Sequence, residues 1–390
     1  MKADLNDNWL PLTQLAEQQV MAGDTCLITG ATGFLGSHFL YWWAKSGGHS
    51  ISLVRGWYAD DAQQRLYNEQ RTAASGYPDR EQNLLNNNTT MLADVCLSGC
   101  GLNVQQKRKL KDKKIRTVWH FAASLRFEQT AIDQVMESNV KAVENIMRLA
   151  SESGAKEFIY ISTAYSCGDQ DGMVKEQLHP LTNQFHNIYE KSKCMAEHVV
   201  MDKARELGLK AVVLRPGIVV GTRPHWHPAG GKSGVYGLLG GLMSFAPLIN
   251  LKSKTKIVLK GDPDARLSLI SVDDVIKDCL NFCVNDFSGN PIRHVTGTGP
   301  RMQDCSNQVT LALDWPTIEF DMNATVTSST QRHLERTLKF YLPYLGLDAR
   351  FERTFPVVDN VTKSNYHNIV KEYILNNSIN NRKNLLKTAI

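Results

Sequence analysis

The stretch TCLITGATGFLG, residues 25–36, decides the fold of this 390-residue chain. An apolar run at residues 25–29 is followed by a G-x-x-G-x-x-G turn and by a helical pattern over residues 34–44. Glycines in such a turn let the backbone approach a pyrophosphate, which binds where the free N–H groups and the dipole of the helix favour an anion. The alternative is a tight strand–helix turn without a ligand. We expect a dinucleotide-binding site with contacts from Gly30, Thr32, Gly33, Phe34, Leu35 and Gly36.

Further apolar runs follow at the spacing of a parallel sheet. Residues 51–54, 118–121, 158–161 and 211–214 form these runs, and helical patterns at 129–151 and 188–206 lie between them. This order indicates βαβ units around a buried parallel sheet. We therefore expect an α/β fold: a Rossmann-type doubly wound parallel sheet with a smaller, mostly C-terminal substrate-binding lobe.

Changes in composition along the sequence also predict how the chain divides into domains. The expected parts are an N-terminal helical extension at 1–22, an NADP-binding Rossmann core at 23–221 and the smaller lobe at 222–390. Part of the segment near 256–285 is expected to return to the core. Residues 66–90, rich in Asn, Gln and Thr, are expected to form a surface excursion.

The composition excludes several classes of protein. With 42% hydrophobic and 21% charged residues, the chain is neither disordered, collagenous nor a coiled coil. A net charge of +5 without a concentrated basic face gives no reason to expect a nucleic-acid partner. No apolar run approaches the ~18 residues of a spanning helix, and the N-terminus is not a secretory signal. Eight cysteines without a Cys-x-x-Cys pair are interpreted as reduced thiols of a cytoplasmic protein.

The residues after the second and third strands bear on the cofactor. Arg55 ends the second strand about 20 residues after the glycine turn, where an NAD site would usually carry Asp or Glu. A guanidinium there suits the 2′-phosphate of NADPH, and Arg65, on the helix expected after this strand, could assist it. Asp94, with Val95 beside it, ends a third strand, where a carboxylate could accept from the adenine amino group. The alternatives are a solvated Arg55 and a loop-capping Asp94.

A Tyr/Lys pair and a hydroxyl-bearing strand end indicate catalysis. Tyr189 and Lys193 stand four apart and so share one face of a helix. A phenol titrates near ~10 unaided, and a lysine one turn away stabilises its anion and can hold the nicotinamide ribose. Upstream, Ser162 and Thr163 close a strand, where either hydroxyl could bond the reacting oxygen or merely cap the strand. His225 and His227 lack a third ligand nearby, so we expect no metal.

With these motifs the chain resembles the extended short-chain dehydrogenase/reductase superfamily, and within it the fatty acyl-CoA reductase (male sterility) and thioester reductase group. The resemblance spans roughly residues 23–280. It is carried by TGATGFLG (29–36), HFAASLRFEQ (120–129), NVKAVENIMRLA (139–150), EFIYISTAYSCG (157–168), YEKSK (189–193), LRPGIVVG (214–221) and LISVDDV (269–275).

The resemblance implies a role for individual residues. Thr163, Tyr189 and Lys193 become the catalytic set, with Thr163 rather than Ser162 in the hydroxyl position. Asn139 becomes the buried helix asparagine that holds backbone groups near the site. Cofactor contacts are implied for Ala122, Ala123, Pro216 and Gly217, the last standing where acyl-CoA reductases commonly carry Ser.

The expected function is NADPH-dependent reduction of an acyl thioester, carried by coenzyme A or a carrier protein, to an aldehyde or onward to an alcohol. The rivals are an NAD(P)-dependent epimerase, dehydratase or ketoreductase acting on a nucleotide sugar or sterol-like alcohol, and a non-catalytic nucleotide sensor. The apolar stretch 235–249 is interpreted as an acyl tunnel, a peripheral membrane contact or buried packing. The basic run 107–114 is a solvated helix face or a dock for an acidic carrier. Oligomeric state is left open.

Overall fold

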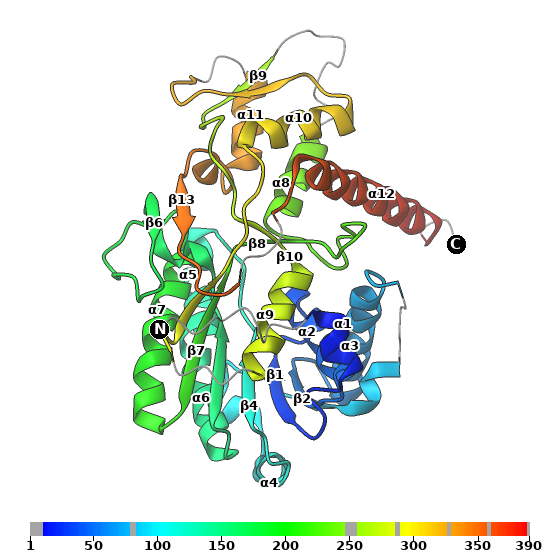
Figure 1. The fold of residues 1–390 in the computed structure, drawn as a ribbon, viewed down its shortest axis with the longest axis vertical. Coiled ribbons are helices and arrows are strands. Elements are labelled where there is room, and N and C mark those ends of the chain that lie inside the picture. Colours follow the sequence, from blue (N-terminus) through cyan, green and yellow to red (C-terminus); the bar gives the residue numbers. More distant parts are fainter. Residues whose placement is uncertain are drawn as a thin grey trace.

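The computed structural model describes residues 11–78, 83–245, 256–284, 289–325, 329–356 and 360–387. Its main layer is a seven-stranded parallel sheet, in the order β11-β7-β5-β4-β1-β2-β3 (Figure 1). The strands are β1 Thr25–Thr29, β2 His49–Val54, β3 Asn88–Leu92, β4 Thr117–His120, β5 Glu157–Ile161, β7 Lys210–Pro216 and β11 Ile292–Val295. The strand order reverses between β1 and β4, so the expected doubly wound Rossmann-type α/β fold is confirmed.

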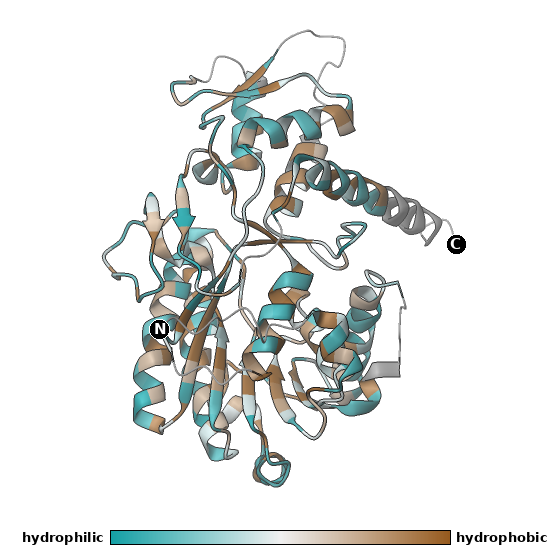
Figure 2. Ribbon diagram, in the orientation of Figure 1, coloured by the Kyte–Doolittle hydropathy of each residue, from teal (hydrophilic) through white to brown (hydrophobic). Residues whose placement is uncertain are grey.

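Helices cover both faces of this sheet and bury apolar strands (Figure 2). One face packs against α1 (Leu12–Glu17), α2 (Phe34–Lys45), α3 (Ala59–Ala74) and α9 (Val272–Val284). The other packs against α6 (Ala142–Glu152) and α7 (Ile188–Leu207). Because helices cover both faces, the central strands β1, β5 and β7 read as continuous apolar runs, whereas the outer strand β3 is polar and only partly buried.

The smaller lobe lies beyond the carboxyl ends of the strands, at the top of Figure 1. It has its own apolar cluster and contains α8 (Val235–Phe245), β9 (Ile257–Leu259), α10 (Met302–Leu313), β12 (Ile318–Phe320), α11 (Ser329–Leu338) and α12 (Lys363–Lys387). Two short parallel pairs lie between lobe and sheet: β8 (Ile218–Val220) with β10 (Leu269–Ser271), and β6 (Gly172–Val174) with β13 (Ala349–Phe351).

The expected surface excursion at 66–90 is wrong at both ends, and its last residues, 88–90, belong to β3 of the main sheet. Residues up to 74 belong to α3, whose polar sequence hides a buried stripe that includes Leu66 and Ala73. The stripe recurs at helical spacing, so the helix survives a sequence rich in Gln and Asn. Residues 1–10 of the expected N-terminal extension lie outside the described residues.

The helix expected over 129–151 contains an irregular turn. After a single 3-10 turn, α5 (Ile132–Met136) leads into a π-turn at Glu137–Lys141 and then into α6. Such π-turns are frequent at functional sites. This one contains Asn139.

The basic run is found at α4 (Val104–Asp112), at the end of the molecule opposite the lobe (Figure 1). Lys107 pairs there with Glu152 at 3.0 Å. This position favours a solvated helix face over a carrier dock beside the lobe. Along the described parts of the chain, no helix is both long and apolar enough to cross a bilayer.

Candidate active site

The glycine turn is closed as tightly as its sequence predicts. Gly30 has a φ of +74°, and a Cβ built on it would lie 2.5 Å from the backbone nitrogen of Ala122. A Cβ on Gly36 would lie 2.2 Å from the carbonyl oxygen of Gly30. Gly33 begins α2 without a side-chain cap, so the first N–H groups of the helix are open. The turn therefore fits a pyrophosphate at the N-terminus of α2.

The expected cofactor residues form two groups, those that line one cavity and those that lie outside its wall. Gly30, Gly33, Phe34, Leu35, Gly36, Ala123, Tyr189, Lys193, Pro216 and Gly217 line one cavity of about 290 Å³. The wall of this cavity does not include Thr32, Arg55, Arg65, Asp94, Val95 or Ala122. The first set surrounds the expected nicotinamide and pyrophosphate, and most of the second lies toward the expected adenosine.

Arg55 follows β2 directly and is exposed. The guanidinium of Arg65, on α3, donates to the carbonyl oxygen of Arg55. The two arginines are thereby brought together. Asp94 accepts from the backbone N–H of Cys96 at 3.0 Å, so one of its oxygens caps the loop after β3.

The two hydroxyls at the end of β5 have different partners. Ser162 donates to the buried carboxylate of Glu197 at 2.5 Å. Thr163 accepts from the backbone N–H of Tyr165 at 3.3 Å, and among the described residues nothing accepts its hydroxyl proton. Both residues line the cavity. Thr163 is therefore the hydroxyl that remains able to donate to a ligand.

Tyr189 and Lys193 lie on the first two turns of α7. The side chain of Asn187 caps this helix by accepting from the N–H of Glu190 at 3.0 Å. Lys193 Nζ donates to the carbonyl oxygen of Ile161 at 2.7 Å and lies 4.6 Å from the centre of the Tyr160 ring. The lysine thus joins α7 to the end of β5.

The electrostatics of this pair differ from the expectation. Burial raises the pKa of Tyr189 well above its usual value, and the charge of Glu190 raises it further. Burial lowers the pKa of Lys193 to about 7, while the charge of Glu197 opposes this shift. The expected lowering of the Tyr189 pKa by Lys193 is therefore absent. Tyr189 keeps its proton and is suited to donate it.

Asn139 fixes the segment that carries the HFAASLRF motif. Its amide accepts from the N–H of Ser124 at 2.7 Å and donates to the carbonyl of the same residue at 3.0 Å. It also donates to Ser192, on α7, at 2.9 Å. The π-turn thus locks the segment against the helix that carries the Tyr/Lys pair.

Alternate residues of this segment face the cavity: Phe121, Ala123, Leu125 and Phe127. The ring of Phe127 meets that of Tyr189 edge-on at 5.8 Å and that of Phe340, from the lobe, at 5.7 Å. Sequence reasoning did not single out Phe121, Leu125 or Phe127. The signal for them is the alternation of apolar residues after β4.

The lobe completes the cavity with apolar and aromatic side chains. Its contribution is Val235, Leu238, Leu267, Phe340, Tyr341, Tyr344 and Leu345, together with Ser233 and Gly234. Two of these come from the 235–249 stretch, of which residues 246–249 lie outside the described chain. Phe340 and Leu267 were not singled out from the sequence.

A buried polar contact holds the lobe to α7. Glu190 is fully buried and accepts from the hydroxyl of Tyr344. The same carboxylate accepts from the N–H and ring nitrogen of His186, at 2.9 and 3.1 Å. Asn187 donates to the Tyr344 oxygen at 2.9 Å. The residue next to Tyr189 is therefore tied to the cavity wall on the lobe side.

The glycine at 217 has a local reason. A Cβ there would lie 2.5 Å from the carbonyl oxygen of Ser268. The backbone at 217 approaches the backbone of Ser268 so closely that the serine common at this position in acyl-CoA reductases would not fit without a shift.

Comparison with known proteins gives a family match and several relatives. A family model of NAD-binding type, described as male sterility protein, matches residues 28–279. Fatty acyl-CoA reductase 2 of Homo sapiens is 26% identical over 232 residues, with 51% of this chain and 44% of that protein covered. The chain spans less than half the length of the first curated relatives it matches.

Two solved structures share the fold over most of the chain. The terminal R domain of the myxalamid PKS-NRPS pathway has a TM-score of 0.71 at 19% identity, with 96% of each chain covered. A thiolation-reductase di-domain from an archaeal non-ribosomal peptide synthetase has a TM-score of 0.68 at 17% identity. It covers 94% of this chain and 80% of its own. At these identities the likeness is one of fold.

Proposed function

We propose, from the premise that this chain belongs to the male sterility protein family, that it is an NADPH-dependent reductase of acyl thioesters. Membership confirms the resemblance found in the sequence and makes the chain an extended short-chain dehydrogenase/reductase with a nicotinamide cofactor. One observation carries the proposal. The cavity that holds Thr163, Tyr189 and Lys193 continues into a lobe wall of apolar and aromatic side chains.

The cofactor, when bound, supplies a hydride to the carbonyl carbon of the substrate. Thr163 and Tyr189 donate hydrogen bonds to the carbonyl oxygen, where negative charge develops, and preorganised donors stabilise that charge most. Tyr189 keeps its proton at neutral pH, so it enters the reaction in the form that can donate this proton to the oxygen. The resulting hemithioacetal then breaks its C–S bond and releases aldehyde and thiol. Lys193, when protonated, holds the ribose beside Tyr189.

We assign the NADPH preference to Arg55 and Arg65. The side chain of Arg65 lies against the backbone of Arg55 after β2, where the adenosine ribose of a Rossmann cofactor lies. Two guanidinium groups match the 2′-phosphate in charge and in donor geometry. The free thiols of all eight cysteines suit a reducing compartment such as the cytoplasm.

The names of the relatives support a thioester substrate. The human relative is a fatty acyl-CoA reductase, and the archaeal reductase is joined to a thiolation domain. A nucleotide sugar would need many fixed polar partners, whereas the lobe wall is mostly apolar and its side-chain polar groups are the hydroxyls of Ser233, Tyr341 and Tyr344. We therefore favour an acyl chain on coenzyme A or on a carrier protein over the sugar epimerase or dehydratase alternative.

The test is a thiol-release assay on the purified protein. With NADPH and acyl thioesters, we expect free thiol and oxidised cofactor in equal amounts, and a rate that rises with chain length. Each buried methylene contributes about 0.8 kcal/mol, so the rise should be steep until the cavity is filled. Turnover of a nucleotide sugar or hydroxysteroid, with no thiol from any acyl-CoA or carrier thioester, would replace the proposal with its rival.

A further inference from the structure

A buried ion pair lies directly behind the catalytic residues. Glu197, on α7, and Arg215, on β7, are both fully buried and meet at 2.5 Å. A second contact, from Arg215 Nε to the same carboxylate, measures 3.0 Å. Glu197 also accepts from Ser162, the residue before Thr163. The pair therefore touches the strand end that carries the catalytic hydroxyl.

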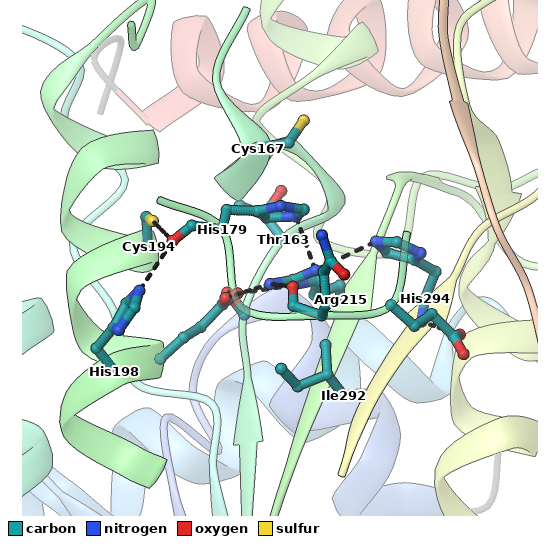
Figure 3. A network of polar contacts seen from close by, with 12 residues as sticks. Thr163, Cys167, His179, Cys194, His198, Arg215, Ile292 and His294 are labelled. Atoms are coloured by element: carbon teal, nitrogen blue, oxygen red, sulfur yellow. Dashed lines mark hydrogen bonds and ion pairs between the residues drawn. The ribbon is translucent and has the colours of Figure 1, made fainter. Parts of the chain in front are cut away.

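The remaining donors of Arg215 are also satisfied. Figure 3 shows its guanidinium between His179 and His294, whose ring nitrogens lie 2.8 and 3.4 Å away. The carbonyl oxygen of Gln177 accepts at 2.9 Å. Burial, and after it the charge of Arg215, lower the pKa of both histidines to about 3, so both rings are neutral. The Glu197–Arg215 pair is thus balanced by itself, with each histidine ring able to accept from the guanidinium.

Such a pair is seldom retained for stability alone. Desolvation of two charges offsets most of their attraction, and apolar replacements of a buried pair are often neutral or stabilising. The position of the pair indicates another role. Glu197 stands four residues after Lys193 and so lies on the same face of α7.

The groups around Lys193 leave Glu197 as its countercharge. From β5 it meets the Ile161 carbonyl oxygen and the Tyr160 ring, which are uncharged. From β4 it faces His120, whose pKa is lowered to about 3 by burial and by Lys193, so that ring is neutral. On α7, Tyr189 keeps its proton. Against the burial that favours neutral Lys193, the opposing charge comes from Glu197.

Resting on the proposed function, we propose that Glu197 is a positioning residue with two tasks. It holds Ser162, and with it the strand end that presents Thr163, and it keeps Lys193 protonated for cofactor binding. Arg215 allows the Glu197 carboxylate to be buried beside Ser162, because its guanidinium fixes the carboxylate and balances its charge.

The test removes the pair without leaving a buried charge. The double variant Glu197→Gln/Arg215→Met is compared with Asp278→Asn/Arg353→Met, which removes another buried pair, at 2.6 Å, that touches none of the catalytic residues. NADPH affinity is measured by fluorescence titration across pH, and kcat and KM with the best thioester. Circular dichroism establishes that both variants are folded.

In the Glu197→Gln/Arg215→Met variant, the pH at which NADPH affinity falls should move down by about one unit or more, because Glu197 is the charge that acts on Lys193 whereas Arg215 does not contribute to its pKa shift. Glu197→Asp keeps the charge and should retain the wild-type midpoint. Ser162→Ala should lower kcat without moving that midpoint. An unchanged midpoint in a folded Glu197 variant, or an equal shift in the Asp278 variant, overturns the proposal. The binding profile needs no turnover, so it reports on Glu197 even if no thioester is reduced.

Discussion

Replacing Gly237 by alanine should shorten the acyl chain that the protein prefers. Gly237 lies on α8, and a Cβ there would sit 2.0 Å from the hydroxyl oxygen of Tyr341 and 3.0 Å from its Cζ. Ordinary contacts of a Cβ start near 3.4 Å, so the tyrosine ring has to move by more than about 1 Å. Tyr341 lines the cavity, and we expect the displaced ring to narrow it.

The size of the effect follows from the methylenes that the moved ring displaces. Each methylene excluded from the cavity costs about 0.8 kcal/mol, which is about a fourfold loss in kcat/KM. Thiol release is measured with NADPH over a homologous series of saturated acyl-CoA thioesters. For the longest substrates of Gly237→Ala we expect about a fourfold loss per excluded methylene, whereas short ones should stay within about twofold of wild type.

Two variants separate this effect from changes in the helix. Gly240→Ala gains the same helix propensity of about 1 kcal/mol, and its Cβ would lie 3.0 Å from the hydroxyl of Tyr373, which does not line the cavity. Gly237→Ala/Tyr341→Phe removes the oxygen that clashes and should restore long-chain activity. Identical chain-length profiles for Gly237→Ala and Gly240→Ala would refute the assignment of Tyr341 to the acyl channel.

Three further predictions concern the catalytic and cofactor residues. Tyr189→Phe keeps the ring contact with Phe127 and should leave NADPH affinity within about twofold, while kcat falls at least ~100-fold; a mutant near wild-type rate removes Tyr189 from its role. Arg55→Asp should weaken NADPH at least about tenfold more than NADH in parallel titrations, since it deletes a phosphate partner and adds a repelling charge; equal losses would contradict that assignment. In the wild type, NADPH affinity should fall as pH rises through about 7, because Lys193 is protonated below this pKa and neutral above it. Affinity that stays flat between pH about 6 and 9 would show that Lys193 does not bind the cofactor through its charge.

The sheet and the dinucleotide turn could be predicted because their signals are local. The central strands, such as β1 and β5, are buried on both faces, so their residues form apolar runs that are visible without knowledge of their neighbours. The turn after β1 is likewise dictated by the glycines at 30 and 36, whose missing side chains permit close backbone contacts. The second half of the polar helix α3, from residue 66 on, was missed because its buried stripe is narrow and its composition is that of a loop.

The cavity wall on the lobe side could not be predicted because its contacts are distant in sequence. Tyr344 meets Glu190 across a separation of 154 residues, and Phe340 meets Phe127 across a longer one. No period or spacing in the sequence encodes such pairs, since their proximity depends on how the whole lobe is placed. The apolar character of α8 was visible, but which of its residues face the substrate was not.

The choice between Ser162 and Thr163 shows what a structure adds to a correct motif. Both hydroxyls stand at the same strand end, and either residue type suits the reaction. The decision lies in a third residue: Glu197 accepts from Ser162, and Arg215, on the neighbouring strand, holds that carboxylate in place. A hydroxyl that donates to a buried carboxylate has no proton left for a substrate oxygen. The Thr163 hydroxyl oxygen accepts a hydrogen bond from the N–H of Tyr165, which leaves its own proton available for a substrate carbonyl. The ion pair that we propose supports Lys193 thereby leaves Thr163 as the hydroxyl that is able to donate to a substrate.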